Sequence, residues 1–411
     1  MVGTDALNQS FPKISVSKEL DGFFEPFAEK RDRFAVLVIR IDEFESVFEQ
    51  LGETITTNLL MKLARVIDNL SKTTPMVWGR VGQDEFACLC QDMDEASGVE
   101  LAKEIQRRLQ LTAKETASIG LAVYPFWPFE KTAILDNARK ALDHAAFFGP
   151  NTVTPFDAVS LNISADKLYQ YGDIEGAIEE FKKALAVDPK DVNVHNSLGV
   201  CHGVKGNFDL AIDAFETAIH LNPEDVMATF NLGLAHFNEG DKEKALDLFL
   251  SAHRLDGENP EVAYQIGTCY QEKNQIDEAL KFFELAAAGE PKGGHVFRGL
   301  GECYFEKELL QDATKAYEKA IRFNPRDAKS LSALGHLYGS IGENLEIAIV
   351  LCRESTEIDP DSGLYRFRLG KLYQQSSEYG KAMEQFKKAE ELGEDCSEVM
   401  GEMEALTAEE A

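Results

Sequence analysis

The sequence predicts an α/β domain at the N-terminus, followed by an all-α solenoid of helical repeats. Two observations lead to this prediction. From about residue 158 onward, glycine, alanine and aromatic residues recur with a period of about 34, which is typical of stacked helix–turn–helix units. Before that point, apolar segments of strand length alternate with amphipathic helical segments, which is typical of an α/β domain. We therefore divide the chain into an N-terminal arm, the α/β domain, the repeats and an acidic capping tail: 1–30, 31–157, 158–396 and 397–411.

The α/β domain alternates five expected strands with four expected helices, and a short helix near residues 18–30 precedes it. The strands cover 34–41, 76–81, 85–90, 116–124 and 151–155. The first is apolar almost throughout, so we expect it in the centre of a sheet, and the last is a short edge strand. The second and third flank a turn that contains a glycine, which predicts a hairpin. Apolar residues at helical spacing place the helices at 44–51, 54–70, 96–109 and 134–147.

Each repeat carries the same few residue types at the same positions. A glycine marks the first helix of most units: Gly199, Gly233, Gly267, Gly301, Gly335 and Gly370. An alanine followed four residues later by an aromatic marks the second helix, except that Cys352 replaces the aromatic in one unit. Proline closes most units. The seven expected units are 158–191, 192–225, 226–259, 260–293, 294–327, 328–362 and 363–396.

These residue types suit two antiparallel helices that cannot bury their apolar faces alone. Gly199 has no side chain, so the partner helix can approach closely, and Ala211 and Phe215 lie on one face of that partner helix. Pro223 ends the unit because proline cannot donate a hydrogen bond back into a helix. The pattern resembles the tetratricopeptide repeat (TPR) family. This resemblance implies a superhelical solenoid whose inner surface is lined by the first helix of each unit.

Four segments of the α/β domain resemble, in the same order, motifs of the GGDEF family, the diguanylate cyclases. The segment 80–86 resembles the family signature, and the others are 40–44, 118–122 and 141–151. The resemblance covers most of residues 31–157 and implies a cyclase-type mixed sheet flanked by helices. Cyclases of this family join two GTP molecules, and they hold Mg²⁺ against the phosphates with two carboxylates because Mg²⁺ prefers hard oxygen ligands.

The same resemblance indicates that most of the nucleotide site has been lost. The first metal-binding carboxylate of the family falls on Arg40, whose positive charge would repel Mg²⁺. Other residues also occupy the guanine-reading, phosphate-binding and inhibitory product-site positions: Phe48, Thr57, Gln83, Ala146, Pro150, Thr73 and Met76. The vestigial nucleotide site consists of Asp42, Gly82, Asp84 and Glu85. We expect its carboxylates to be solvated groups at a strand end and a turn.

A stripe on the first helices is the expected partner-binding surface. It lies opposite the packing stripe, and its residues vary between units while the packing residues barely change. The TPR resemblance places this stripe in the groove, where aromatic side chains are common interface anchors. We predict that a segment of another protein binds there to Asn196, Phe230, Leu234, Phe237, Tyr264, Gln271, Arg298 and Phe305. The alternative is that superhelix curvature buries some of these aromatics between units.

The charge of the chain limits its partners. The net charge is −29, and residues 1–157 account for −7 of it, with 17 Lys and Arg against 24 Asp and Glu. The remainder has 25 against 47, a net charge of −22. Because nucleic acids and anionic lipids bind cations, we expect no nucleic-acid partner. The acidity either keeps the surface soluble or attracts a basic partner.

The remaining composition points to a cytoplasmic protein. No apolar run approaches the roughly 20 residues that a membrane helix needs, so we expect no membrane insertion. The N-terminus lacks the features of a secretory signal. Seven cysteines with no CxxC pair suggest reduced, buried thiols and no metal site.

We therefore predict a non-catalytic scaffold or adaptor in bacterial signalling, with no cofactor, which binds a partner segment in the TPR groove. The alternative is an enzyme or a sensor: a divergent nucleotide cyclase, or a protein that binds a nucleotide in the GGDEF-like domain. Titration with GTP, ATP and cyclic di-GMP would separate these alternatives.

Overall fold

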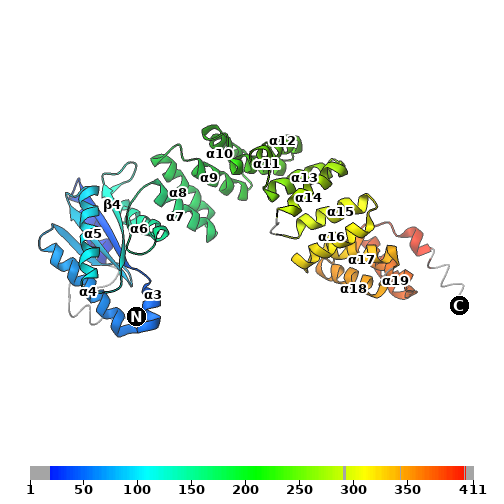
Figure 1. The fold of residues 1–411 in the computed structure, drawn as a ribbon, viewed down its shortest axis with the longest axis horizontal. Helices are drawn as coiled ribbons and strands as arrows, with labels where there is room; N and C mark the ends of the chain where they lie inside the picture. The colour runs from blue at the N-terminus through cyan, green and yellow to red at the C-terminus, as the bar shows by residue number, and fades with distance from the viewer. Residues whose placement is uncertain (1–18, 290–292, 343, 402, 404–411) are drawn as a thin grey trace. The chain divides into compact units, whose positions relative to one another are not determined.

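The structure is a computed structural model that describes residues 19–289, 293–342, 344–401 and 403. The chain divides into two compact units, Met1–Pro223 and Glu224–Ala411, and each is described by itself (Figure 1). Residues 1–18 of the predicted arm and residues 404–411 of the predicted tail lie outside the described residues.

A five-stranded sheet with the order β2-β3-β1-β4-β5 forms the centre of the N-terminal domain (Figure 1). The central strand β1 (Phe34–Ile41) is antiparallel to both β3 (Glu85–Gln91) and β4 (Ala117–Tyr124). β2 (Met76–Arg80) pairs with β3 as the predicted hairpin, and β5 (Val153–Pro155) runs parallel to β4. The sheet is therefore mixed, and its most apolar strand is central, as the sequence predicts.

Helices cover both faces of this sheet. α3 (Phe44–Leu51) follows β1, and α4 (Glu53–Ser71) and α5 (Glu95–Gln110) pack on one face through an apolar core. α2 (Glu19–Glu29) and α6 (Ile134–Ala145) contribute to the core on the other face. α6 lies so close to β4 that a Cβ atom on Gly120 would be 2.1 Å from the carbonyl oxygen of Ala138. Glycine is required there for the helix to contact the sheet.

The first two repeats belong to the same compact unit as the sheet. They comprise α7 (Ala158–Gln170), α8 (Ile174–Val187), α9 (Val192–Val204) and α10 (Phe208–Leu221). One apolar core continues from the sheet through Leu142 of α6 into Leu161 of α7 and Phe181 of α8. Lys140 of α6 also pairs with Glu180 of α8 at 2.7 Å, and both side chains are largely buried. The first repeat is therefore built onto the α/β domain, with no separate core at the predicted boundary.

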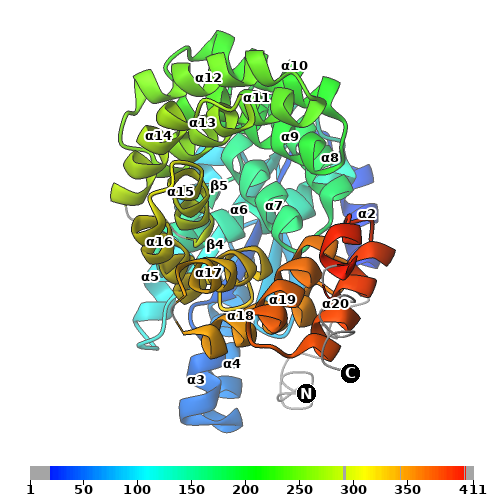
Figure 2. The ribbon, with the colours of Figure 1, turned by 90° about the vertical axis from the view of Figure 1, so that its right-hand side faces the viewer.

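In the described residues of the second unit, five further helix pairs follow one another in sequence order (Figure 2). They are α11 (Val226–Glu239), α12 (Lys242–Leu255), α13 (Pro260–Glu272), α14 (Ile276–Ala288), α15 (His295–Glu306), α16 (Leu310–Phe323), α17 (Ala328–Ile341), α18 (Leu345–Ile358), α19 (Gly363–Gln375) and α20 (Tyr379–Glu391). After the last pair, Val399 and Met403 are buried in the same apolar cluster as Phe386. The predicted all-α solenoid is confirmed.

The recurring glycine of the first helix and the recurring aromatic of the second helix contact each other. A Cβ atom on Gly233 would lie 2.6 Å from the ring of Phe249, and the same close approach joins Gly267 to Phe283 at 2.7 Å. In the unit where Cys352 replaces the aromatic, its sulfur lies 2.6 Å from the corresponding position on Gly335. The aromatic ring of the second helix thus fills the space that the absent side chain leaves on the first helix.

All seven cysteines are buried and unpaired. Burial raises the pKa of Cys90 to about 12, so its thiol remains protonated near neutral pH. None of the helices in the described part of the chain is both long and apolar enough to span a bilayer.

Candidate functional site

Arg40 forms the centre of an ion-pair cluster at the position where the family resemblance places a metal ligand. It lies near the end of β1, directly opposite Glu85 of β3 in the strand register. Its Nη2 lies 2.5 Å from Glu85 Oε1, and its Nε donates to the same oxygen at 2.9 Å. Glu85 therefore neutralises the arginine. The same carboxylate oxygen would have to give up two hydrogen bonds to coordinate a metal ion.

A second carboxylate extends this cluster into the first repeat. Nη1 of Arg40 lies 3.3 Å from Asp143 Oδ1 on α6, and the other oxygen of Asp143 is 2.8 Å from Lys167 Nζ on α7. Burial alone would lower the pKa of Arg40, but the hydrogen bonds and charges of Glu85 and Asp143 outweigh it and raise the pKa. The guanidinium is thus a fixed cation that joins β1, β3 and α6.

Asp42 is a structural hydrogen-bond acceptor. Its carboxylate accepts hydrogen bonds from the hydroxyls of Thr116 and Ser118, each at 2.6 Å, and from the backbone N–H of Asn151 at 2.7 Å. These bonds fix the segment that leads into β5 against the end of β1. We expected the carboxylates of the vestigial nucleotide site to be solvated, and for Asp42 and Glu85 this expectation is wrong. Neighbouring donors occupy both groups because the chain supplies a hydroxyl or an arginine beside each.

The other members of the vestigial nucleotide site lie in the turn between β2 and β3. A Cβ atom on Gly82 would lie 3.2 Å from Glu85 Cβ, so the turn is tight. Burial, and then the adjacent charge of Glu85, raise the pKa of Asp84. At the guanine-reading positions, Phe48 is 37% exposed on α3 and Thr57 is half-buried on α4.

A small pocket remains beside Arg40. Its volume is about 280 Å³, and its lining includes Arg40, Asp42, Ser118 and Gly149. Within the described residues, no group of three or more histidine, cysteine, aspartate or glutamate side chains is arranged to hold a metal ion. The pocket therefore contains a paired cation and an aspartate that is already hydrogen-bonded.

Sequence reasoning singled out Arg40 but missed Asp143, the residue that completes its cluster. Asp143 lies in the segment 141–151, which resembles a GGDEF motif, so an acidic residue was visible there. Its contact with Arg40, which lies 103 residues earlier, could not be read from the two segments.

The structure gives the aromatic residues of the predicted groove different environments. Phe230 is only 6% exposed and packs against Phe249, with ring centroids 5.6 Å apart. Phe237 is half-buried, with Lys242 Nζ 5.9 Å from its ring centroid. Tyr264 and Phe305 are also half-buried, each against a histidine ring of the next unit. Phe230 thus belongs to the packing between helices, as the alternative interpretation allowed for some of these aromatics.

Polar residues of the predicted groove join adjacent first helices. Gln271 of α13 donates to Glu302 of α15 at 2.9 Å, and Arg298 of α15 pairs with Asp327, which caps α17, at 2.9 Å. Leu234 is half-buried on α11, and Asn196 is half-buried on α9 in the other unit. The second unit therefore places Leu234, Phe237, Tyr264, Gln271, Arg298 and Phe305 on successive first helices.

Comparison with protein families agrees with both halves of this architecture. The family described as diguanylate cyclase, GGDEF domain, matches residues 4–151. Three tetratricopeptide repeat families match residues 165–203, 202–260, 264–328 and 365–396.

Two curated relatives resemble the chain over part of their length. A bifunctional diguanylate cyclase/cyclic di-GMP phosphodiesterase, MucR, of Pseudomonas aeruginosa is 29% identical over 197 residues, which is 45% of this chain and 28% of that protein. Diguanylate cyclase A of Treponema denticola is 24% identical over 134 residues, which is 31% of this chain and 36% of that protein. The chain thus spans about a third of each relative.

Solved structures of repeat proteins match the solenoid region. YrrB, described as a TPR protein with an unusual peptide-binding site, is 25% identical, with 49% of this chain and all of that chain covered and a TM-score of 0.41. A tetratricopeptide repeat protein from Parabacteroides merdae is 20% identical, with 61% of this chain and 98% of that chain covered and a TM-score of 0.43.

Proposed function

We propose that this chain, which carries a GGDEF domain followed by tetratricopeptide repeats, is a non-catalytic scaffold that binds a segment of another protein. The observation that supports this proposal is the ion-pair cluster of Arg40 with Glu85 and Asp143. The two curated relatives are bacterial, and we place this protein in the bacterial cytoplasm, in signalling.

The Arg40 cluster opposes metal binding in two ways. Mg²⁺ requires oxygen ligands, and a guanidinium offers only N–H donors. Oε1 of Glu85 already accepts two hydrogen bonds from Arg40, so this oxygen could bind a metal only by giving them up. Without a metal, the cation that lines the small pocket is Arg40, whose charge Glu85 and Asp143 already balance.

The partner site that we propose lies on the first helices. Leu234, Phe237, Tyr264 and Phe305 are apolar or aromatic and half-buried, and such residues anchor many protein interfaces. Gln271 and Arg298 supply polar groups on α13 and α15 of the same unit, and Asn196 is the predicted partner-binding residue of the other unit. Because Phe230 is buried, we expect it to support its neighbours without touching the partner.

A cyclase assay tests the first half of the proposal. The full-length protein, incubated with GTP and either Mg²⁺ or Mn²⁺, is expected to form no cyclic di-GMP detectable by chromatography and mass spectrometry. The Asp84→Ala variant serves as the control. Product that appears with the native chain and disappears with this variant would contradict the proposal.

A substitution in the groove tests the second half. Phe237→Glu should weaken capture of a purified partner at least tenfold, because it buries a charge in an apolar contact. Leu285→Glu is the matched control, since Leu285 is 39% exposed on the second helix α14. Circular dichroism checks that both variants keep their helices. If Phe237→Glu and Leu285→Glu capture the partner equally well, the partner does not bind at Phe237.

A nucleotide sensor is the second candidate function. The pocket beside Arg40 favours it, since its volume of about 280 Å³ leaves room for a small ligand. Calorimetric titration with GTP, ATP and cyclic di-GMP distinguishes the candidates. The scaffold proposal predicts no heat of binding for any of the three, whereas saturable binding that is lost in Arg40→Ala would favour the sensor.

A further inference from the structure

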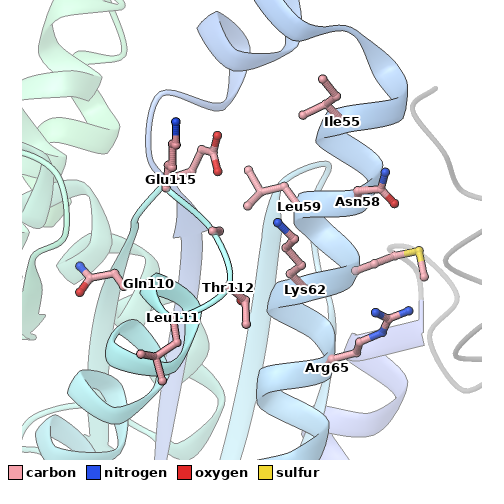
Figure 3. Close-up of a pocket in the computed structure, with 12 residues that line it drawn as sticks. Ile55, Asn58, Leu59, Lys62, Arg65, Gln110, Leu111, Thr112 and Glu115 are labelled. Carbon is pink, nitrogen blue, oxygen red and sulfur yellow. The ribbon is translucent and has the colours of Figure 1, made fainter.

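A larger pocket lies on the opposite face of the α/β domain's central sheet from α6, between α4 and the turn that joins α5 to β4 (Figure 3). We call it the α4 pocket. Its volume is about 610 Å³. In Figure 3, Leu59 and Lys62 project from α4 toward the turn formed by residues 110–115. None of the residues of the vestigial nucleotide site lines it.

Three cations line the α4 pocket, and none forms an ion pair with another residue of the described chain. Lys62, Arg65 and Lys114 make no ion pair or side-chain hydrogen bond with any other residue that the structure describes. The lining contains a single carboxylate, that of Glu115. The pocket therefore has a local net charge of about +2, in a chain whose net charge is −29.

Several other cations of the same domain do have partners. Arg107 and Arg108 share Glu104 at 2.7 and 2.6 Å, and Lys72 at the end of α4 lies 3.2 Å from Asp68. Lys103 and Arg139 of this domain also form no ion pair with a described residue. The α4 pocket differs in that three such cations line one pocket with a single carboxylate, and this grouping points to an anionic ligand.

Apolar groups share the rim of the pocket with these cations. Leu111 is 72% exposed and Ile55 is 45% exposed, and Met61 and Leu59 also contribute to the lining. Exposed apolar surface beside unpaired charge is typical of an interaction site. A ligand that fills the pocket has to carry an apolar group as well as a negative charge.

We propose that the α4 pocket binds an acidic segment of a partner protein, one in which carboxylates alternate with aliphatic side chains. The pocket is too large for an isolated phosphate ion, and its cations lie on two separate elements. Its lining includes no aromatic side chain on which a nucleobase could stack, which argues against single-stranded nucleic acid. This site is separate from the groove and does not depend on the function proposed above.

Fluorescence anisotropy with the full-length protein tests this proposal. The probe is a short labelled peptide of glutamate, leucine and serine, and its counterpart has glutamine in place of glutamate. We expect the acidic peptide to bind and the glutamine peptide to bind at least tenfold more weakly, with an affinity for the acidic peptide that falls as salt is added. An absence of binding, or equal binding of the two peptides, would overturn the proposal.

A matched pair of triple variants locates the site. Lys62→Gln, Arg65→Gln and Lys114→Gln together should weaken binding of the acidic peptide at least tenfold. Arg33→Gln, Lys72→Gln and Arg107→Gln together change the net charge equally but neutralise cations that already have partners. This control should change the affinity less than threefold. Equal losses in the two triple variants would mean a non-specific charge effect and would overturn the proposal.

Two further measurements separate the remaining ligand classes. Leu111→Ser should weaken the acidic peptide several-fold, because it removes an exposed apolar contact. Inorganic pyrophosphate at equal ionic strength should not displace the peptide. Displacement by pyrophosphate together with indifference to Leu111→Ser would identify a small-anion site and contradict a peptide-binding one. Thermal melting of each variant confirms that it remains folded.

Discussion

The Arg40 cluster and the α4 pocket belong to the same domain, yet their charged residues behave in opposite ways. Arg40 contacts two carboxylates, one of which also contacts Lys167, and Asp42 accepts three hydrogen bonds. Around the α4 pocket, three cations have no ion pair with any residue that the structure describes. Charged groups of the Arg40 cluster are thus paired with one another, whereas the cations of the α4 pocket remain available to a ligand.

The two sites contain similar residue types. They differ in whether their charged side chains already have ion-pair partners within the protein, and this difference separates a structural role from a binding role. Both sites contain arginine and acidic residues, and both border a pocket. At the Arg40 cluster, a ligand has to compete with internal ion pairs that already satisfy the charges. At the α4 pocket it competes only with water, so binding costs less there.

The largest expected effect comes from forcing α6 away from the sheet. In Gly120→Ala, the new Cβ would lie 2.1 Å from the carbonyl oxygen of Ala138 and 2.3 Å from the backbone nitrogen of Leu142. Since backbone cannot move aside cheaply, we expect a loss of about 3 kcal/mol or more in the free energy of unfolding. α6 would also carry Asp143 away from Arg40. Chemical denaturation measures this effect.

Gly98→Ala is the matched control for this change. Its Cβ would meet the side chain of Leu121 at 2.8 Å, and that side chain can adopt another rotamer. Alanine also favours the helix that contains residue 98. We expect a loss below about 1 kcal/mol. Similar losses for the two substitutions would show that the contact of α6 with the sheet is not the sensitive one.

A smaller effect is expected from removing the cation of the Arg40 cluster. Arg40→Ala leaves Glu85 without its partner and Asp143 with Lys167 alone, and it should lower the free energy of unfolding by about 1–2 kcal/mol. The control is Arg33→Ala, whose ion pair with Asp94 is about half exposed and should therefore contribute much less to stability. If thermal melts show equal losses for both variants, the Arg40 cluster does not stabilise the fold.

The smallest expected effect is the pH dependence that Asp84 introduces. Because burial and Glu85 raise its pKa, folded Asp84 binds a proton more readily than unfolded Asp84. Its contribution to stability is therefore favourable at low pH and is lost as the pH rises through the folded-state pKa. Asp84→Asn should be slightly more stable than the native chain at pH 7 and equal to it at low pH, as melting temperatures would measure.

Asp94 provides a control of opposite sign for this measurement. Hydrogen bonds from Ser97 lower its pKa, so its contribution to stability is present at neutral pH and disappears as the pH falls. Asp94→Ala should therefore lose stability at pH 7 and approach the native chain at low pH. If Asp84→Asn behaves in the same way as Asp94→Ala, burial is not what controls the charge of Asp84.

The solenoid could be predicted from the sequence because its main contact is periodic. Gly233 and Phe249 lie 16 residues apart and touch, and the same spacing recurs at Gly267 and Phe283. A contact between residues at a fixed separation leaves a visible repeat in the sequence. The central strand β1 was predictable for a similar reason, since a strand covered on both faces has to be apolar at nearly every position.

The sites were less predictable because they depend on contacts between distant segments. Arg40 and Asp143 lie 103 residues apart, and the α4 pocket combines α4 with a turn some 50 residues later in the chain. The burial of Phe230 could not be predicted from the sequence either. Phe230 is buried and Tyr264 is half-buried, although both occupy the same position in their repeats. Which of these residues contact one another depends on three-dimensional packing, and nothing in their spacing indicates it.

The continuous core that joins the sheet to α7 and α8 also constrains the order of events during synthesis. Leu142 and Phe156 pack in the same cluster as Leu161 and Phe181, so part of this core is completed only when the first repeat has been synthesised. A chain that ends near residue 157 would lack Leu161 and Phe181, and its side of this cluster would be exposed to water.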